Sequence, residues 1–89
     1  MKKMSIEIKE VGDILKINKL IEKSKYDKLN VDVGIGDSHM VDGRSILGLM
    51  NVFGQNMTMV VYGDTELENE FLVDLAGIVR IEYAINTKK

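Results

Sequence analysis

The sequence contains no cysteine and no proline, and it has a single histidine, His39. Without cysteine there is no disulfide framework, no thiolate metal site and no thiol nucleophile. One histidine also falls short of the three or four donors that a metal site normally needs. Chemistry that depends on a histidine beside a proline is excluded as well. The sequence therefore predicts a protein without a metal or another cofactor.

Neither sign of charge dominates, and no apolar run is long enough to cross a bilayer. Twelve Lys and Arg stand against fourteen Asp and Glu, which gives a net charge of −2. A balance this even argues against nucleic acid or a membrane as the main partner and favours a protein. The first four residues lead into an alternating pattern instead of a signal-peptide core. We expect a soluble chain without a leader, with the cytoplasm as its simplest compartment.

The first half of the chain shows strand and helix patterns in turn. Apolar and polar residues alternate over 4–9, which is typical of a half-buried strand. Asp13 stands where a helix N-cap would, before apolar residues at helical spacing from 14 to 21. The alternation returns over 29–35, and a short strand over 39–41 follows a turn. These patterns predict a strand, a helix and a hairpin.

The second half adds two helices and a strand. Ser45 is predicted to cap a short helix over 46–53, whose residues are apolar on more than one side. Residues 57–62 are apolar enough on both faces for a strand inside a sheet. Thr65 and Glu68 have the spacing of a capping box, which predicts the start of a third helix.

The C-terminal pattern fits two structures. Residues 79–85 alternate as a strand would, whereas Leu75, Ile78, Val79 and Tyr83 also fit one face of a helix. Either the third helix, with apolar positions from 67 to 79, runs on, or a further strand joins the edge of the sheet.

This order of elements predicts one α+β domain, 1–89. We expect an open-faced sandwich in which three helices cover one face of a four-stranded antiparallel sheet, in the order βαββαβα. Whether an additional C-terminal strand follows is left open by the sequence. The other face of the sheet should meet water, and it should carry Ser5, Glu7, Lys9, Asn30, Asp32, Thr58 and Tyr62.

The segment from Arg44 to Gly54, RSILGLMNVFG, resembles the stretch around the regulatory serine of HPr, the small phosphocarrier protein of the sugar phosphotransferase system. Residues 24–27 are similar to the end of the first HPr helix, and residues 57–63 are similar to its last strand and turn. The predicted element order is also that of HPr. With small insertions, the resemblance covers essentially the whole chain and implies an HPr-like fold.

The phosphohistidine of that family has no counterpart here. HPr proteins carry it at the start of the first helix, in a Gly-x-His-Ala-Arg-Pro setting. The corresponding stretch runs from Gly12 to Ile17, with Ile14 at or next to the histidine position. An isoleucine cannot accept a phosphoryl group, and Asp13 would repel a phosphate at the helix N-terminus. The resemblance thus implies a chain that is not an enzyme and has lost the phosphocarrier reaction. We expect His39 to be an exposed, inert histidine in a hairpin.

Ser45 matches the serine that a dedicated ATP-dependent kinase modifies in the family, and Arg44 stands where a basic residue usually precedes it. A phosphate on Ser45 would meet the positive end of the following helix. The residues by themselves also allow a plain N-cap, which needs no kinase. Both interpretations stay open.

The apolar residues Ile46, Leu47 and Met50 also have two interpretations. Each could belong to the core, but burying all of them would require a two-turn helix covered nearly all round. The resemblance implies that they form, with Arg44, a partner-binding patch, and a flexible methionine suits such a surface.

Three hypotheses for function follow. The first is a regulatory, protein-binding HPr homologue that is switched by phosphorylation at Ser45 and meets an HPr kinase or a transcriptional regulator. The second is a phosphotransferase-system carrier that uses an unrecognised acceptor, for which His39 is the only candidate. The third is an assembly module, a homo-oligomer in which the C-terminal strand pairs with the sheet edge of another copy.

Overall fold

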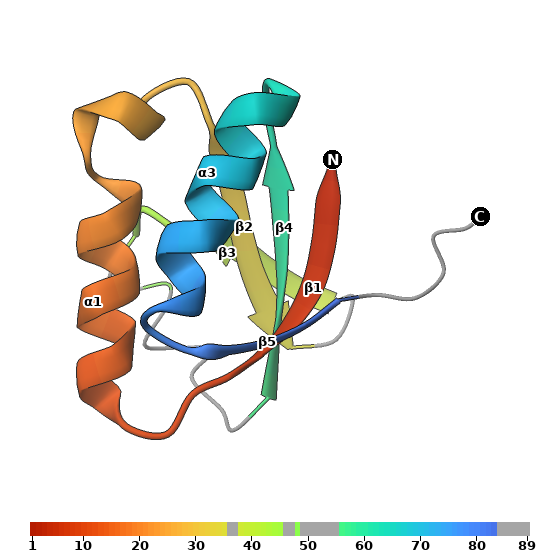
Figure 1. Cartoon of the computed structure of the whole chain (residues 1–89). Coiled ribbons are helices and arrows are strands. Elements are labelled where there is room, and N and C mark those ends of the chain that lie inside the picture. The colour runs from red at the N-terminus through yellow and green to blue at the C-terminus, as the bar shows by residue number, and fades with distance from the viewer. Residues whose placement is uncertain (36–37, 46–47, 49–55, 84–89) are drawn as a thin grey trace.

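The computed structural model describes residues 1–35, 38–45, 48 and 56–83 (Figure 1). Within these residues the chain forms five strands, two α-helices and one short 3-10 helix, η1. They are β1 (Lys2–Glu7), α1 (Val11–Ile21), η1 (Ser24–Tyr26), β2 (Asn30–Ile35), β3 (Ser38–Asp42), β4 (Asn56–Tyr62), α3 (Thr65–Ala76) and β5 (Arg80–Tyr83).

The strands form one antiparallel sheet in the order β3-β2-β4-β1-β5. Both α-helices lie against the same face of this sheet (Figure 1). The predicted α+β class with an antiparallel sheet is therefore confirmed. The doubly apolar segment 57–62 lies in β4, at the centre of the sheet, as its composition indicated. The sheet has five strands instead of four.

The fifth strand resolves the ambiguity of the C-terminal pattern. Helix α3 ends at Ala76, and β5 pairs with β1 so that Ile81 lies opposite Ile6. The third helix is therefore shorter than its apolar pattern up to Val79 indicated. A strand is favoured here because β1 pairs with β4 on one side only, and its backbone groups on the other side need hydrogen-bond partners, which β5 supplies. Local periodicity carries no information about that distant edge. Residues 84 and 85 of the alternating pattern lie outside the described residues.

The helix predicted over 46–53 also lies largely outside the described residues. Within that range the structure describes Gly48 alone, which has helical conformation.

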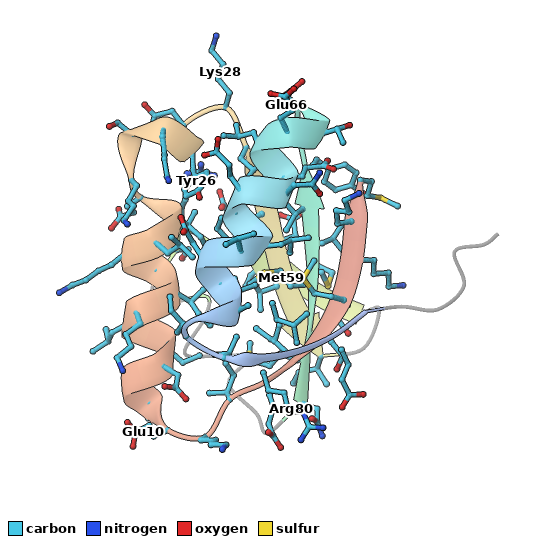
Figure 2. The ribbon with its side chains drawn as sticks, in the orientation of Figure 1. Glu10, Tyr26, Lys28, Met59, Glu66 and Arg80 are labelled. Atoms are coloured by element: carbon cyan, nitrogen blue, oxygen red, sulfur yellow. The ribbon has the colours of Figure 1, made fainter. Side chains whose placement is uncertain are left out.

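The core fills the space between the sheet and the helices. Tyr26 and Phe71 are fully buried, and their rings meet edge to face with centroids 5.2 Å apart. Figure 2 shows Tyr26 between the α1–η1 side and α3, and Met59 between the helices and the sheet. The residues that the sequence assigned to the open face are all exposed or half-buried: Ser5, Glu7, Lys9, Asn30, Asp32, Thr58 and Tyr62. Of these, Lys9 lies beyond the end of β1, in the connection to α1.

The first helix begins earlier than predicted. Its N-cap is Glu10, and Asp13 is the third residue of the helix instead of the cap. The Asp13 carboxylate accepts hydrogen bonds from the backbone amides of Lys9 and Glu10, at 3.1 and 3.3 Å. A carboxylate at this position completes a capping box from inside the helix, so the same residue type fits two registers.

The third helix also begins one residue earlier, with Asp64 as its N-cap. Thr65 is its first residue, so the predicted capping box is wrong. The Glu68 carboxylate instead accepts a hydrogen bond from the Gly63 amide at 2.9 Å, and the ammonium group of Met1 lies 3.1 Å from the same oxygen. These two partners offset the cost of burying a charge on a residue that is only 1% exposed. Neither helix in the described part of the chain is long and apolar enough to cross a membrane.

Candidate functional site

Ser45 follows β3 in a tight turn that its own backbone holds together. The backbone amide of Ser45 donates to the Asp42 carbonyl at 3.0 Å, and the Arg44 amide donates to the Asp42 carboxylate at 2.9 Å. The Gly43 amide donates to the Val31 carbonyl at 2.7 Å. Three successive backbone amides are thus satisfied, which gives the segment before Ser45 a defined conformation.

The same turn is packed against α1 and β2. A Cβ atom on Gly43 would lie 2.8 Å from Ile21 Cδ1 and 3.0 Å from the Val31 carbonyl oxygen, so only glycine fits without displacement. From α1, the Asn18 side-chain amide donates to the carbonyl oxygens of Gly43 and Arg44, at 3.4 and 3.2 Å. The turn therefore has a fixed position relative to the helical layer.

Ser45 itself is exposed, and its Oγ accepts a hydrogen bond from the Gly48 backbone amide at 3.1 Å. A bond from the amide three residues further on is the one that an N-cap side chain accepts, and the sequence predicted Ser45 as an N-cap. A Cβ atom on Gly48 would lie 3.1 Å from Ser45 Oγ and 3.2 Å from Val41 Cβ, so glycine permits this close approach. The hydroxyl is at once a cap and accessible to solvent.

Arg44 has a contact that the sequence could not indicate. Its Nη2 donates to the backbone carbonyl of Tyr26 at 2.7 Å, and the residue is half-buried. The two residues are far apart in the sequence, so no local pattern reports the pair. Arg44 thus ties the turn before Ser45 to η1.

The three apolar residues predicted to form a partner patch, Ile46, Leu47 and Met50, lie outside the described residues. Their assignment to a binding surface stays a prediction. Of the predicted patch, the structure describes Arg44 alone.

Ile14 is completely buried, inside α1 and one turn beyond its N-cap. An open cleft of about 480 Å³ lies beside this end of α1, bounded on its other side by the connection from α3 to β5. Its charged lining consists of Glu7, Lys9, Glu10, Asp13 and Arg80. Three carboxylates against two cations make this cleft a poor place for a phosphoryl group. Figure 2 shows Glu10 and Arg80 at this end of the molecule.

His39 lies in β3, the second strand of the hairpin that the sequence predicted, at one edge of the sheet. Its side chain is outside what the structure describes. Among residues 1–35, 38–45, 48 and 56–83, no three His, Cys, Asp or Glu side chains are grouped to hold a metal ion.

The sequence did not predict the charged cluster of Lys25, Tyr26 and Asp74, which lies between η1 and α3. The Tyr26 hydroxyl donates to Asp74 Oδ2 at 2.5 Å, and Lys25 Nζ lies 3.3 Å from the same oxygen. Burial, followed by the bond to Asp74, raises the pKa of Tyr26 to about 12. The Tyr26 hydrogen bond lowers the pKa of Asp74, and the bond to Asp74 raises the pKa of Lys25. The cluster joins η1 to α3 through residues that share no sequence motif.

A scan against protein-family models and searches of curated proteins and of solved structures found no match to this chain.

Proposed function

We propose that this chain is an HPr-like regulatory module: it binds protein partners, has no phosphohistidine, and is switched by phosphorylation at Ser45. The proposal extends the sequence resemblance around Ser45, with an HPr-like arrangement of β1 to β4 and three helices, to which β5 is added, as its finer fold. The observation that carries it is the exposed residue Ser45, whose hydroxyl oxygen accepts a hydrogen bond from the Gly48 amide.

The surroundings of Ser45 suit a phosphate. The Gly48 amide already donates to the oxygen that would carry the phosphoryl group. A dianionic phosphate accepts stronger hydrogen bonds from backbone amides than a hydroxyl does, and it favours the N-terminal end of a helical turn. The turn from Asp42 to Arg44 is held by its own bonds, so a kinase would meet the serine in a defined backbone conformation.

The N-terminus of α1 supports the loss of the phosphocarrier reaction. Ile14 is buried and chemically inert, and the amides of Lys9 and Glu10 already bond to Asp13. A phosphohistidine at a helix N-terminus needs amides that are available and a site without carboxylates. Neither requirement is met here, because Asp13 occupies the two amides and the neighbouring cleft is lined by Glu7, Glu10 and Asp13.

Partner binding is assigned to the residues on either side of Ser45, namely Arg44 before it and Ile46, Leu47 and Met50 after it. A phosphate beside this patch would change its charge by about −2 at neutral pH. Such a change favours a partner with a basic rim and disfavours an acidic one, which makes phosphorylation a selector between partners.

The test is incubation of the full chain with an HPr kinase and ATP, followed by intact-mass measurement. We expect one phosphoryl group on the native chain and none on Ser45→Ala. The matched control is Ser24→Ala, because Ser24 is also exposed, follows a basic residue and begins a helical turn. This control should be modified like the native chain.

Absence of modification with a kinase that is active on HPr would contradict the switch, and so would label on a residue other than Ser45. A parallel incubation with phosphoenolpyruvate and the first enzyme of the phosphotransferase system examines the carrier hypothesis. An acid-labile phosphate on His39 would replace our proposal with that hypothesis.

A further inference from the structure

The strand β5 is one of the two edge strands of the sheet, and its outer edge can pair with another chain. Within the described residues, β5 pairs with β1 on one side only, because the strand order is β3-β2-β4-β1-β5. An edge strand presents a row of backbone donors and acceptors to which another chain can add. This edge is separate from the turn at Ser45.

The side chains of β5 alternate between the two faces of the sheet. Ile81 is half-buried and packs against the core, opposite Ile6 of β1. Arg80 and Glu82 are exposed and lie on the open face, opposite Glu7 and Ser5. The edge therefore presents a cation and an anion on either side of one apolar residue.

This arrangement is complementary to itself. If two copies of β5 pair antiparallel about a two-fold axis at Ile81, Arg80 of each copy lies opposite Glu82 of the other. The two isoleucines then meet on the core face. Opposite charges facing each other across an antiparallel pair are favourable, and this register places two such pairs side by side. Shifting it by one residue would turn core-facing side chains toward the open face.

We propose that two copies of this chain associate through β5, antiparallel and centred on Ile81, to form one sheet that continues across both copies. Pairing of β5 with the β3 edge of a second copy is a different arrangement, because it leaves an unused β5 at one end of the assembly and an unused β3 at the other, so further copies can add and a chain of molecules forms. The two-fold arrangement is favoured because it satisfies Arg80 and Glu82 at once and closes at two copies. The contact is short, so the dimer is weak.

The experiment is sedimentation equilibrium of the full chain at concentrations from about 10 µM to about 1 mM, a range that suits a small interface. We expect the average mass to rise from the 10.0 kDa of one chain towards twice that value. Two charge-reversal variants, Arg80→Glu and Glu82→Arg, are measured alone and mixed in equal amounts. Far-UV circular dichroism verifies that each is folded.

Each variant alone should stay at the mass of one chain, since it places like charges opposite each other twice. The mixture should recover the doubled mass, because one variant presents two acids and the other two bases. Glu82→Arg is the cleaner single change, because its partner on β1 is the uncharged Ser5.

Three results would overturn the proposal. One is a native chain that keeps the mass of a single chain at every concentration. Another is a pair of folded variants that associate alone as well as the native chain does, which places the contact elsewhere. A mass that grows beyond two copies would assign the contact to the edges of β5 and β3 in open succession.

Discussion

At the scale of single residues, Ser45 has two properties: its side chain makes a structural hydrogen bond, and the residue is exposed to solvent. Its hydroxyl holds the Gly48 amide, which is a structural task, and it remains exposed, which a kinase requires. Because the cap needs only an oxygen acceptor, a phosphorylated serine can retain it. The structural role and the proposed regulatory role therefore use the same atom in compatible ways.

The capping role predicts a measurable cost for Ser45→Ala. Removing the side-chain acceptor leaves the Gly48 amide without this bond, and we expect a loss of about 1 kcal/mol in the free energy of unfolding. Urea denaturation followed by circular dichroism measures it. Ser45→Asp, which keeps an acceptor, should lose less than half of that amount, and equal losses for both variants would contradict the cap.

The pair of Tyr26 and Asp74 predicts a pH-dependent effect. The Tyr26 hydroxyl lowers the pKa of Asp74 below its usual value of 3.8. Its contribution to stability is thus complete above that value and is lost as the pH falls through the lowered pKa. Tyr26→Phe should cost about 1–2 kcal/mol at neutral pH, since a bond to a partly exposed charged group is removed.

The difference between Tyr26→Phe and the native chain should narrow as the pH falls from about 5 to about 2, because Asp74 becomes neutral in both. Thermal or urea unfolding across this range measures the difference. Tyr62→Phe is the matched control, since Tyr62 is exposed on the open face of the sheet. A constant difference at every pH would show that the hydroxyl acts through packing and not through the carboxylate.

At the scale of elements, the sequence predicted what local patterns determine. The strand and helix periods located β1, α1, β2 and β4, because each buries one face or both against the same core. The helix starts shifted, because a carboxylate such as Asp13 can stabilise an N-terminus from two positions. The end of α3 and the formation of β5 could not be decided from the sequence, because they depend on the edge of β1 to which β5 adds. That edge is far away in the sequence.

The contacts of the candidate site are likewise of two kinds: those between residues close in the sequence, which could be predicted, and those between distant residues, which could not. The bond from Gly48 to Ser45 spans three residues and was predicted from residue types alone. The contact of Arg44 with the Tyr26 carbonyl, and the carboxylates that gather at the start of α1, result from the folded arrangement. Local sequence could not report either one.

Two glycines, Gly43 in the turn after β3 and Gly77 at the end of α3, should respond in opposite ways to substitution by alanine. Gly43→Ala should cost about 1–3 kcal/mol in the free energy of unfolding, because the added Cβ would lie 3.0 Å from a backbone oxygen and 2.8 Å from Ile21. Gly77→Ala should be neutral or stabilise by up to about 1 kcal/mol, since its φ of −79° suits alanine and the nearest atom is 3.4 Å away. Urea denaturation measures both, and similar losses would contradict the close approach at Gly43.

At the scale of the whole molecule, the two proposed interactions use separate structures. The turn at Ser45 follows β3, at one edge of the sheet, whereas β5 forms the other edge. A partner at the turn and a second copy at β5 could therefore be present together. Phosphorylation at Ser45 should leave association through β5 unchanged, because the modified residue is not part of that edge.

The central claim is that this chain receives phosphate on Ser45 and no longer on a histidine. The most direct measurement is site-resolved mass spectrometry of the full chain after incubation with an HPr kinase and ATP. We predict acid-stable phosphate on Ser45, none on Ser45→Ala, and native levels on Ser24→Ala. An unmodified chain beside a fully modified HPr control, or phosphate at any other residue, would contradict the account.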